Sequence, residues 1–211
     1  MKFSIKNLFA TALTLVVLTG TAFASTPSPS NNVTVLNQVK NINKIVVSGN
    51  VEVLLIQAPI ESVKVYDSYY AKNALVQQQE GELRISSFEK QTLTVAVYVR
   101  ELSTIELRDN SSVKTYGKVN FLNLAVILKG SAKADIDANT INLTTTVKDN
   151  ANLELSGSTT DHYVVLSSNA KMNMDQFKAE NISVNSITAA YAKVNNTKKQ
   201  TVESAMKELS K

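Results

Sequence analysis

His162 is the only histidine in the chain, and its chemistry is that of a general base or a metal ligand. The chain has no cysteine, so a metal site here would need carboxylates around the imidazole. Asp161 is adjacent, but neighbouring residues of a strand point to opposite faces of the sheet. We therefore interpret His162 as a structural residue.

Asp135 and Asp137 lie two residues apart on an expected strand and so share one face. Carboxylates stacked with others from adjacent strands, such as Asp109 or Asp149, bind Ca²⁺ or act as acid–base pairs in β-helical polysaccharide lyases and hydrolases. Ile136 takes the inward position, however, so both aspartates are expected to face solvent. The common phosphate-loop, dinucleotide, nucleophile-elbow, zinc and calcium-repeat patterns are absent from the sequence. We predict no catalytic residue, no metal site and no cofactor.

The densest aromatic group consists of Tyr66, Tyr69 and Tyr70. A tyrosine combines an apolar ring face with a polar tip, so an exposed group of this kind can stack on sugar rings. These three residues are the candidates for contact with a glycan or a partner. Packing inside an irregular part of the fold is the alternative.

A repeat of about twenty residues must position these side chains. Five segments align, at residues 109–115, 130–136, 149–155, 168–174 and 188–194. Their fifth and seventh positions are mostly apolar, which is typical of a strand with one buried face. Their third position is always tiny, as Ser111, Ala132, Ala151, Ala170 and Ala190.

Each unit is predicted to be two short strands joined by a tight corner of Asn, Asp, Gly and Ser, residues that favour turn conformations. Stacking buries the apolar face that one unit cannot bury alone. We therefore predict an all-β, single-domain parallel β-helix (β-solenoid) with coils of about 20 residues, whose corner asparagines hydrogen-bond along the stack. A jelly roll or β-sandwich is the alternative.

In this alignment His162 occupies the column that elsewhere holds Leu124, Leu143 and Ile182. The chain before residue 100 alternates less regularly, and a turn at Glu80-Gly81 indicates hairpin-like pairs there.

The ends of the chain differ from the repeats. Residues 1–24 have a basic start, a short apolar run and an Ala-Phe-Ala cleavage site, which predict a signal peptide. Residues 25–40 are predicted to be a flexible leader because they begin with “STPSPSNN”. Residues 41–196 are predicted to form the β-solenoid domain, and residues 197–211 a helical tail that caps the last coil or frays. The helical stripe consists of Val202, Ala205, Met206 and Leu209.

Charge and cysteine content exclude several classes. Cleavage removes Lys2 and Lys6 from the 22 basic residues, which oppose 18 acidic ones, so the mature chain is nearly neutral. No basic stripe with aromatic residues is visible, which argues against nucleic-acid binding. Without cysteine the chain has no disulfide and no lipid-modified N-terminal cysteine. We expect an exported chain, in the periplasm or at the cell surface, with no membrane span after cleavage.

Four segments, “INKIVVSGNVEVLLIQA”, “GELRI”, “LSTIELRDNSSVKTYG” and “LAVILKGSAKADI”, resemble the “putative auto-transporter adhesin, head GIN domain” family over about residues 41–196. The resemblance implies a single-domain β-solenoid on the outer side of the inner membrane. The family's corner glycine survives only at Gly130. Asp109, Asp149, Ser168 and Thr188 take its place, and Thr188 is a poor fit for positive φ.

Three functional hypotheses follow. The first is a non-enzymatic, exported cell-envelope protein, an adhesin-like binding or structural module that contacts an envelope glycan or protein. The second is a β-helix carbohydrate-active enzyme, either a polysaccharide lyase or a hydrolase. The third is a structural envelope module that self-associates weakly.

Overall fold

The computed structural model describes residues 33–66, 74–87, 89–167, 169–186 and 192–193. Every regular element within these ranges is a strand, and they contain no helix. The predicted signal peptide (1–24), the first half of the predicted leader (25–32 of 25–40) and the predicted helical tail (197–211) lie outside the described residues. The leader's described part includes one short strand, Val33–Leu36.

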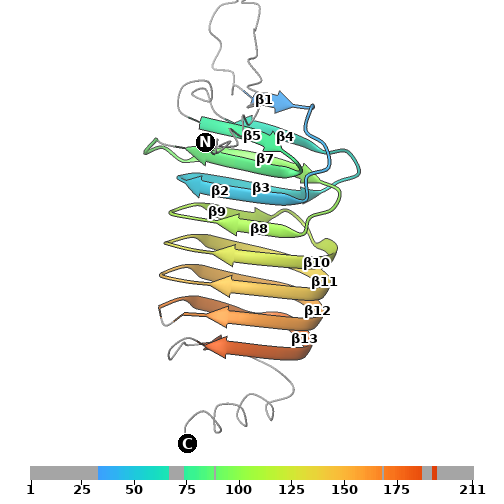
Figure 1. Ribbon diagram of the computed structural model, residues 1–211, viewed down its shortest axis with the longest axis vertical. Helices are drawn as coiled ribbons and strands as arrows, with labels where there is room; N and C mark the ends of the chain where they lie inside the picture. Colours follow the sequence, from blue (N-terminus) through green and yellow to red (C-terminus); the bar gives the residue numbers. More distant parts are fainter. Residues whose placement is uncertain (1–32, 67–73, 88, 168, 187–191, 194–211) are drawn as a thin grey trace, which may run out of the picture. The chain divides into compact units, whose positions relative to one another are not determined.

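Fourteen strands form one sheet (Figure 1). They are β1 Val33–Leu36, β2 Lys44–Gly49, β3 Val51–Gln57, β4 Ser62–Tyr66, β5 Ala74–Gln79, β6 Glu82–Ser87, β7 Leu93–Val99, β8 Thr104–Leu107, β9 Ser112–Thr115, β10 Val119–Leu128, β11 Lys133–Val147, β12 Asn152–Leu166, β13 Lys171–Ser186 and β14 Ala192–Lys193. The first part of β11 pairs with β9 and its remainder pairs with β10, so the sheet curls.

The predicted fold class was all-β, which is correct, but the predicted parallel β-helix is wrong, and the predicted helical cap lies outside the described residues. The sheet is mixed, because β1, β4 and β7 pair antiparallel, as do β5 and β6. It curls as a half-barrel instead of forming a stack of parallel coils throughout. The physical reason lies in the irregular first half. Glu80 and Gly81 both have positive φ, 50° and 81°, which is the geometry of a tight hairpin turn. The expected hairpin-like pair is therefore confirmed there.

In the second half the ladders join residues one repeat apart. Lys133 of β11 lies opposite Asn152 of β12, and Asn152 lies opposite Lys171 of β13. Ala132, Ala151 and Ala170 precede these positions and are all buried. The ladder hydrogen bonds continue next to these alanines: the amide of Lys133 donates to the Ser111 carbonyl and that of Asn152 to the Ala132 carbonyl.

The corners explain why aspartate replaces the family's glycine. Asp109 and Asp149 have φ of 60° and 58°, close to the 71° of Gly130. Aspartate tolerates this left-handed conformation better than most residues. Each carboxylate also accepts a hydrogen bond from the neighbouring strand's glycine amide, Asp109 from Gly49 at 3.1 Å and Asp149 from Gly130 at 2.8 Å. The expectation for these two aspartates is confirmed, whereas Ser168 and Thr188 lie outside the described residues.

Asparagine ladders are present, but they lie at residues 120–123 and 139–142 and not at the tight corners for which they were predicted. The Asn139 amide donates to Asn120 Oδ1 at 3.1 Å, and the Asn142 amide donates to Asn123 Oδ1 at 2.7 Å. The second ladder continues where Asn181 donates to Asp161 at 2.9 Å. These amides stabilise the fold by satisfying one another along the ladder.

His162 is a structural residue, as predicted, and it lies in the core. It lies opposite Leu143 and Ile182 in the ladders and is buried. Its Nε2 shares a hydrogen bond of 3.0 Å with the Thr145 hydroxyl, and its ring meets Phe177 edge-on with centroids 5.5 Å apart. Nδ1 has no hydrogen-bond partner within the described part of the chain. Burial disfavours the imidazolium and lowers the pKa of His162 to about 4.

Stability should therefore fall in acid. The pKa of His162 is lower in the folded chain than the ordinary 6.5, so the unfolded chain binds the proton more readily below pH 6.5. The free energy of unfolding is expected to drop by about 3 kcal/mol between pH 6.5 and pH 4 through this residue. His162→Leu, which repeats the side chain of the column, should lose this part of the pH dependence. Equal slopes of denaturant stability against pH in both proteins would contradict this assignment.

Gly157 is required by backbone packing. Its φ is +99°, and a Cβ there would lie 2.1 Å from the carbonyl oxygen of Ala138 on the neighbouring strand. Gly157→Ala should lower the free energy of unfolding by about 3 kcal/mol or more, since a ladder must separate. Gly117→Ala is the matched control. Gly117 also has positive φ, +83°, but nothing lies within 4 Å of its Cβ, so only strain of about 1 kcal/mol is expected. A similar melting shift for both variants would argue against close packing at Gly157.

Candidate functional site

The two aspartates weighed as a catalytic or calcium site are surface residues. Asp135 and Asp137 are half-buried on the outward side of β11. Asp135 accepts a hydrogen bond from the Lys114 ammonium at 2.7 Å, and Asp137 lies 3.6 Å from that of Lys118. Each acid therefore pairs with a lysine. In the described ranges no group of three or more His, Asp or Glu side chains is placed to hold a metal ion.

Of the three candidate tyrosines, only Tyr66 lies within the described residues. Tyr66 ends β4, and its side chain is exposed. Tyr69 and Tyr70 lie outside the described residues, so whether the three rings form one surface stays a prediction.

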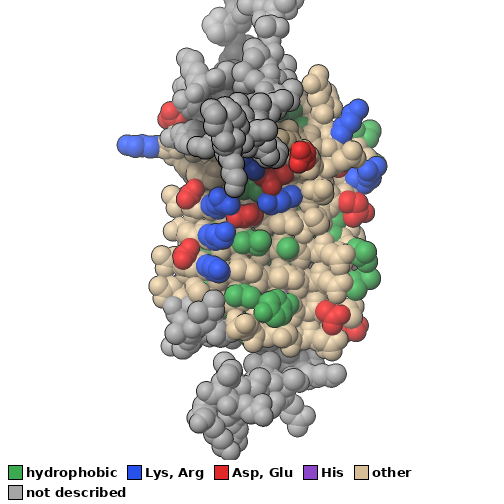
Figure 2. All heavy atoms as spheres, in the orientation of Figure 1, with side chains coloured by type: hydrophobic (Ala, Val, Ile, Leu, Met, Phe, Trp, Pro, Cys, Tyr) green, Lys and Arg blue, Asp and Glu red, His purple; other side chains and the backbone are tan. Residues whose placement is uncertain are grey.

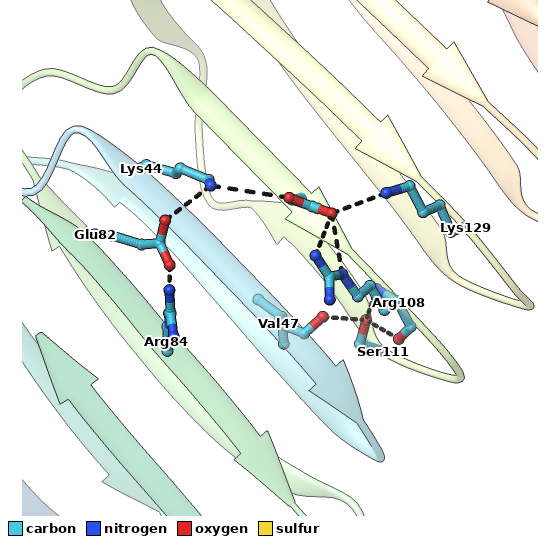
Figure 3. Close-up of polar contacts among 8 residues, drawn as sticks. Lys44, Val47, Glu82, Arg84, Arg108, Ser111 and Lys129 are labelled. Atoms are coloured by element: carbon cyan, nitrogen blue, oxygen red, sulfur yellow. Dashed lines mark hydrogen bonds and ion pairs between the residues drawn. The ribbon is translucent and has the colours of Figure 1, made fainter. Parts of the chain in front are cut away.

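The structure instead brings together a cluster of charged side chains that the sequence did not indicate. We call it the Glu106 cluster, and its members come from β6, β2, β8 and the turns after β8 and β10 (Figure 3). It consists of Lys44, Glu82, Arg84, Glu106, Arg108 and Lys129.

Glu106 is the centre of this cluster and its side chain is only 9% exposed. One oxygen, Oε1, accepts hydrogen bonds from Arg108 Nη2 at 2.8 Å, from Arg108 Nε at 3.0 Å and from Lys129 Nζ at 3.1 Å. The other oxygen lies 3.9 Å from Lys44 Nζ. Figure 3 shows these three cations directed at the one carboxylate.

Lys44 extends the cluster to a second acid. Its Nζ lies 2.8 Å from Glu82 Oε2, and Glu82 Oε1 accepts a hydrogen bond from Arg84 Nε. The polar chain therefore crosses four adjacent strands in the order β6, β2, β8 and β10, with Lys129 just after β10. Four cations oppose two carboxylates, which leaves the cluster with a net charge of +2.

The acids of the cluster are held ionised. Burial alone would raise the pKa of Glu106, but hydrogen bonds from Arg108 and Lys129 outweigh it, and the pKa lies below the ordinary 4.5. Hydrogen bonds from Lys44 and Arg84 likewise lower the pKa of Glu82. Both carboxylates therefore remain charged at neutral pH.

The backbone places Arg108 by a corner hydrogen bond. The Ser111 hydroxyl, fully buried, donates to the Arg108 carbonyl at 2.7 Å, and the Arg108 amide donates back to Ser111 Oγ at 3.1 Å. Ser111, the small residue at the third position of the repeat, thus fixes the backbone of the turn from which the Arg108 side chain extends.

Arg108 begins a basic column that continues along the sheet. Lys129 and Lys148 follow the paired residues Leu128 and Val147, just as Arg108 follows Leu107. Among the described residues no ion pair involves Lys148. A sequence signal for this column exists, because a basic residue stands directly before each of the corners at Asp109, Gly130 and Asp149.

Beside the basic column the outward side chains are mostly small or aliphatic. Val46, Ile127 and Val165 lie in the ladder column of Glu106 and are half-buried, whereas Tyr163 is 43% exposed. Figure 2 shows this face, with basic side chains following one another and hydrophobic side chains beside them. The face combines charge, a flat aliphatic surface and an aromatic ring.

The Glu106 cluster should contribute to stability. Glu106→Gln leaves Arg108, Lys129 and Lys44 close together without their carboxylate, and we expect the free energy of unfolding to fall by about 1–2 kcal/mol. The loss stays below that of a fully buried pair because the cations reach solvent. Asp135→Asn, which breaks an exposed pair with Lys114, is the control and should change the unfolding midpoint little. Equal midpoints for Glu106→Gln and the parent in urea would contradict a stabilising role.

No helix within the described ranges is long and apolar enough to cross a membrane.

Known proteins share this architecture. A crystal structure of a putative adhesin from Bacteroides fragilis aligns with a TM-score of 0.62 at 17% identity, covering 75% of this chain and 78% of that one. A putative lipid binding protein from Parabacteroides distasonis aligns with a TM-score of 0.58 at 10% identity, covering 74% and 78%. At such identities the similarity shows the fold alone. A search of curated proteins found no match.

The sequence pattern of one family covers most of the chain. It is the family described as “Putative auto-transporter adhesin, head GIN domain”, and it matches residues 41–207. The match includes the segments in which the resemblance was seen, and the predicted family is confirmed. The chain belongs to the “putative auto-transporter adhesin, head GIN domain” family.

Proposed function

We propose that this protein is a non-enzymatic, exported module of the cell envelope that binds an envelope glycan or protein in the manner of an adhesin. The family description names an adhesin, and the first matched crystal structure carries the same name. The family description and the names of the two matched structures refer to adhesion or to binding. Export rests on the predicted signal peptide and on the family, and the site of residence is the periplasm or the cell surface.

The observation that carries the proposal is the ordered outward face of the sheet. The inward side chains fill one apolar core. The outward side chains of successive strands then stand in rows about 4.8 Å apart, fixed by the ladder hydrogen bonds. Such a surface is rigid before it meets a partner, so little conformational entropy is lost when it binds.

The alternative of a β-helix carbohydrate-active enzyme loses its support, because it depended on a parallel β-helix and on the outward aspartates. Those aspartates pair with Lys114 and Lys118. Weak self-association stays a prediction from the sequence.

The tyrosine group is part of this proposal as a glycan contact. The test is binding of the purified, labelled protein to cell-envelope fractions and to a glycan array. Substitution of Tyr66, Tyr69 and Tyr70 by alanine should weaken glycan binding about tenfold or more, because each lost ring removes stacking. Tyr116→Ala is the control, since Tyr116 is also exposed and lies in the turn after β9.

Two outcomes would contradict these statements. Absence of binding to every envelope fraction and every glycan would overturn the adhesin-like function. Binding that survives the triple substitution unchanged would overturn only the role of the tyrosines.

A further inference from the structure

We propose that the face built on the Glu106 cluster and the basic column binds an acidic polysaccharide, a glycan that carries carboxylate, sulfate or phosphate groups. This inference rests on the proposed binding function and names the ligand class for one face. The face consists of Arg108, Lys129 and Lys148 together with the neighbouring Ile127, Val165 and Tyr163.

Charge complementarity is the first argument. The basic column places three cations on successive turns, while the acids nearest to them are already engaged. Glu106 lies beneath Arg108 and Lys129, with the two cations 52% and 42% exposed above it. Asp109 and Asp149 border the column, but each directs an oxygen to a glycine amide. The exposed faces of the cations therefore remain available to an anion from solvent.

Preorganisation is the second argument. Arg and Lys side chains lose much rotamer freedom when they are fixed on binding. Here the buried carboxylate of Glu106 already holds Arg108 through two hydrogen bonds and Lys129 through one. An anion that arrives at these cations meets side chains already ordered, which lowers the entropic cost of the complex.

Periodicity is the third argument, and it favours a polymer. The cations recur once per strand, at about 4.8 Å. A chain with regularly spaced anionic groups can contact several of them at once, and each further contact is then intramolecular and gains avidity. A single small anion gains no such avidity along the column.

The rest of the face suits a sugar better than a lipid surface. Tyr163 is the exposed aromatic ring of the face and offers a stacking plane. Thr144 is exposed and Thr146 half-buried beside it, and their hydroxyls donate and accept hydrogen bonds. Membrane-surface binding needs large, protruding apolar side chains that enter the acyl region. Ile127 and Val165 are instead half-buried among the other side chains of the strands.

The experiment compares two double variants that remove equal charge. Lys129→Gln with Lys148→Gln alters the basic column, and Lys133→Gln with Lys171→Gln alters two exposed lysines that start β11 and β13. Affinity is measured for immobilised polygalacturonate, alginate and dextran sulfate, with neutral dextran as a blank. Vesicles containing phosphatidylglycerol form a separate arm. NaCl is set at about 0.01 M and 0.15 M, where the Debye length is roughly 30 Å and 8 Å.

The parent protein should bind at least one acidic glycan, not dextran, and more weakly at the higher salt. The column variant should lose about tenfold in affinity and the control about twofold at most. If the column variant melts earlier than the parent, Lys148→Gln alone serves as the test, because Lys148 forms no ion pair with any described residue. That single variant should still lose about threefold.

Several results would overturn the inference: no binding to any acidic glycan, equal losses in both double variants, or tighter binding to the vesicles than to the glycans. These results are distinct from failure of the proposed function. A protein that binds envelope fractions equally well with and without the column substitutions is still an adhesin-like module, but one whose ligand is not an acidic polysaccharide bound at this face.

Discussion

The in-register pairing of neighbouring strands is the constraint on which the rest of this structure depends. Each strand from β11 to β13 repeats the side-chain pattern of the strand before it, one repeat further along the chain, apart from one bulge between β12 and β13. A ladder in register places like residue over like residue. Small residues then stack on small ones at the corners, apolar ones fill a continuous core, and asparagines bond one another. Any residue that departs from its column must be accommodated locally.

His162 and Gly157 show how such departures are accommodated. His162 replaces an aliphatic residue in its column, and its imidazole shares a hydrogen bond with the Thr145 hydroxyl and makes an edge-on contact with Phe177. It stays neutral, as its depressed pKa indicates. Gly157 faces Ala138 so closely that a side chain would collide with the carbonyl oxygen. In both cases the neighbouring strand determines what the position tolerates.

Much of the second half could be predicted from the sequence because its contacts repeat at a constant offset. The buried alanines, the positive φ of Asp109 and Asp149, and the place of His162 all follow from one alignment. The first half could not be predicted in the same way. There the order in the sheet is β8, β2, β6, β5, which is not the chain order, and antiparallel strands close that end. Lys44 and Glu106 are far apart in the sequence, and only the strand order reveals their contact.

The in-register ladder also produces the charged face, and it does so at an electrostatic cost. A column that repeats Arg108, Lys129 and Lys148 sets like charges beside one another, which destabilises a sheet. Glu106 offsets this repulsion at the Arg108 end of the column. It stands in a ladder position where the neighbouring strands carry Val46 and Ile127. That carboxylate sets one negative charge against the first two cations, and it lies two strands away from Lys148, which follows β11. The protein's own carboxylates therefore reduce the repulsion among Arg108, Lys129 and Lys148 only in part. A bound anionic chain would reduce it further. The register that builds the core thus also creates a surface whose own electrostatics favour an acidic ligand.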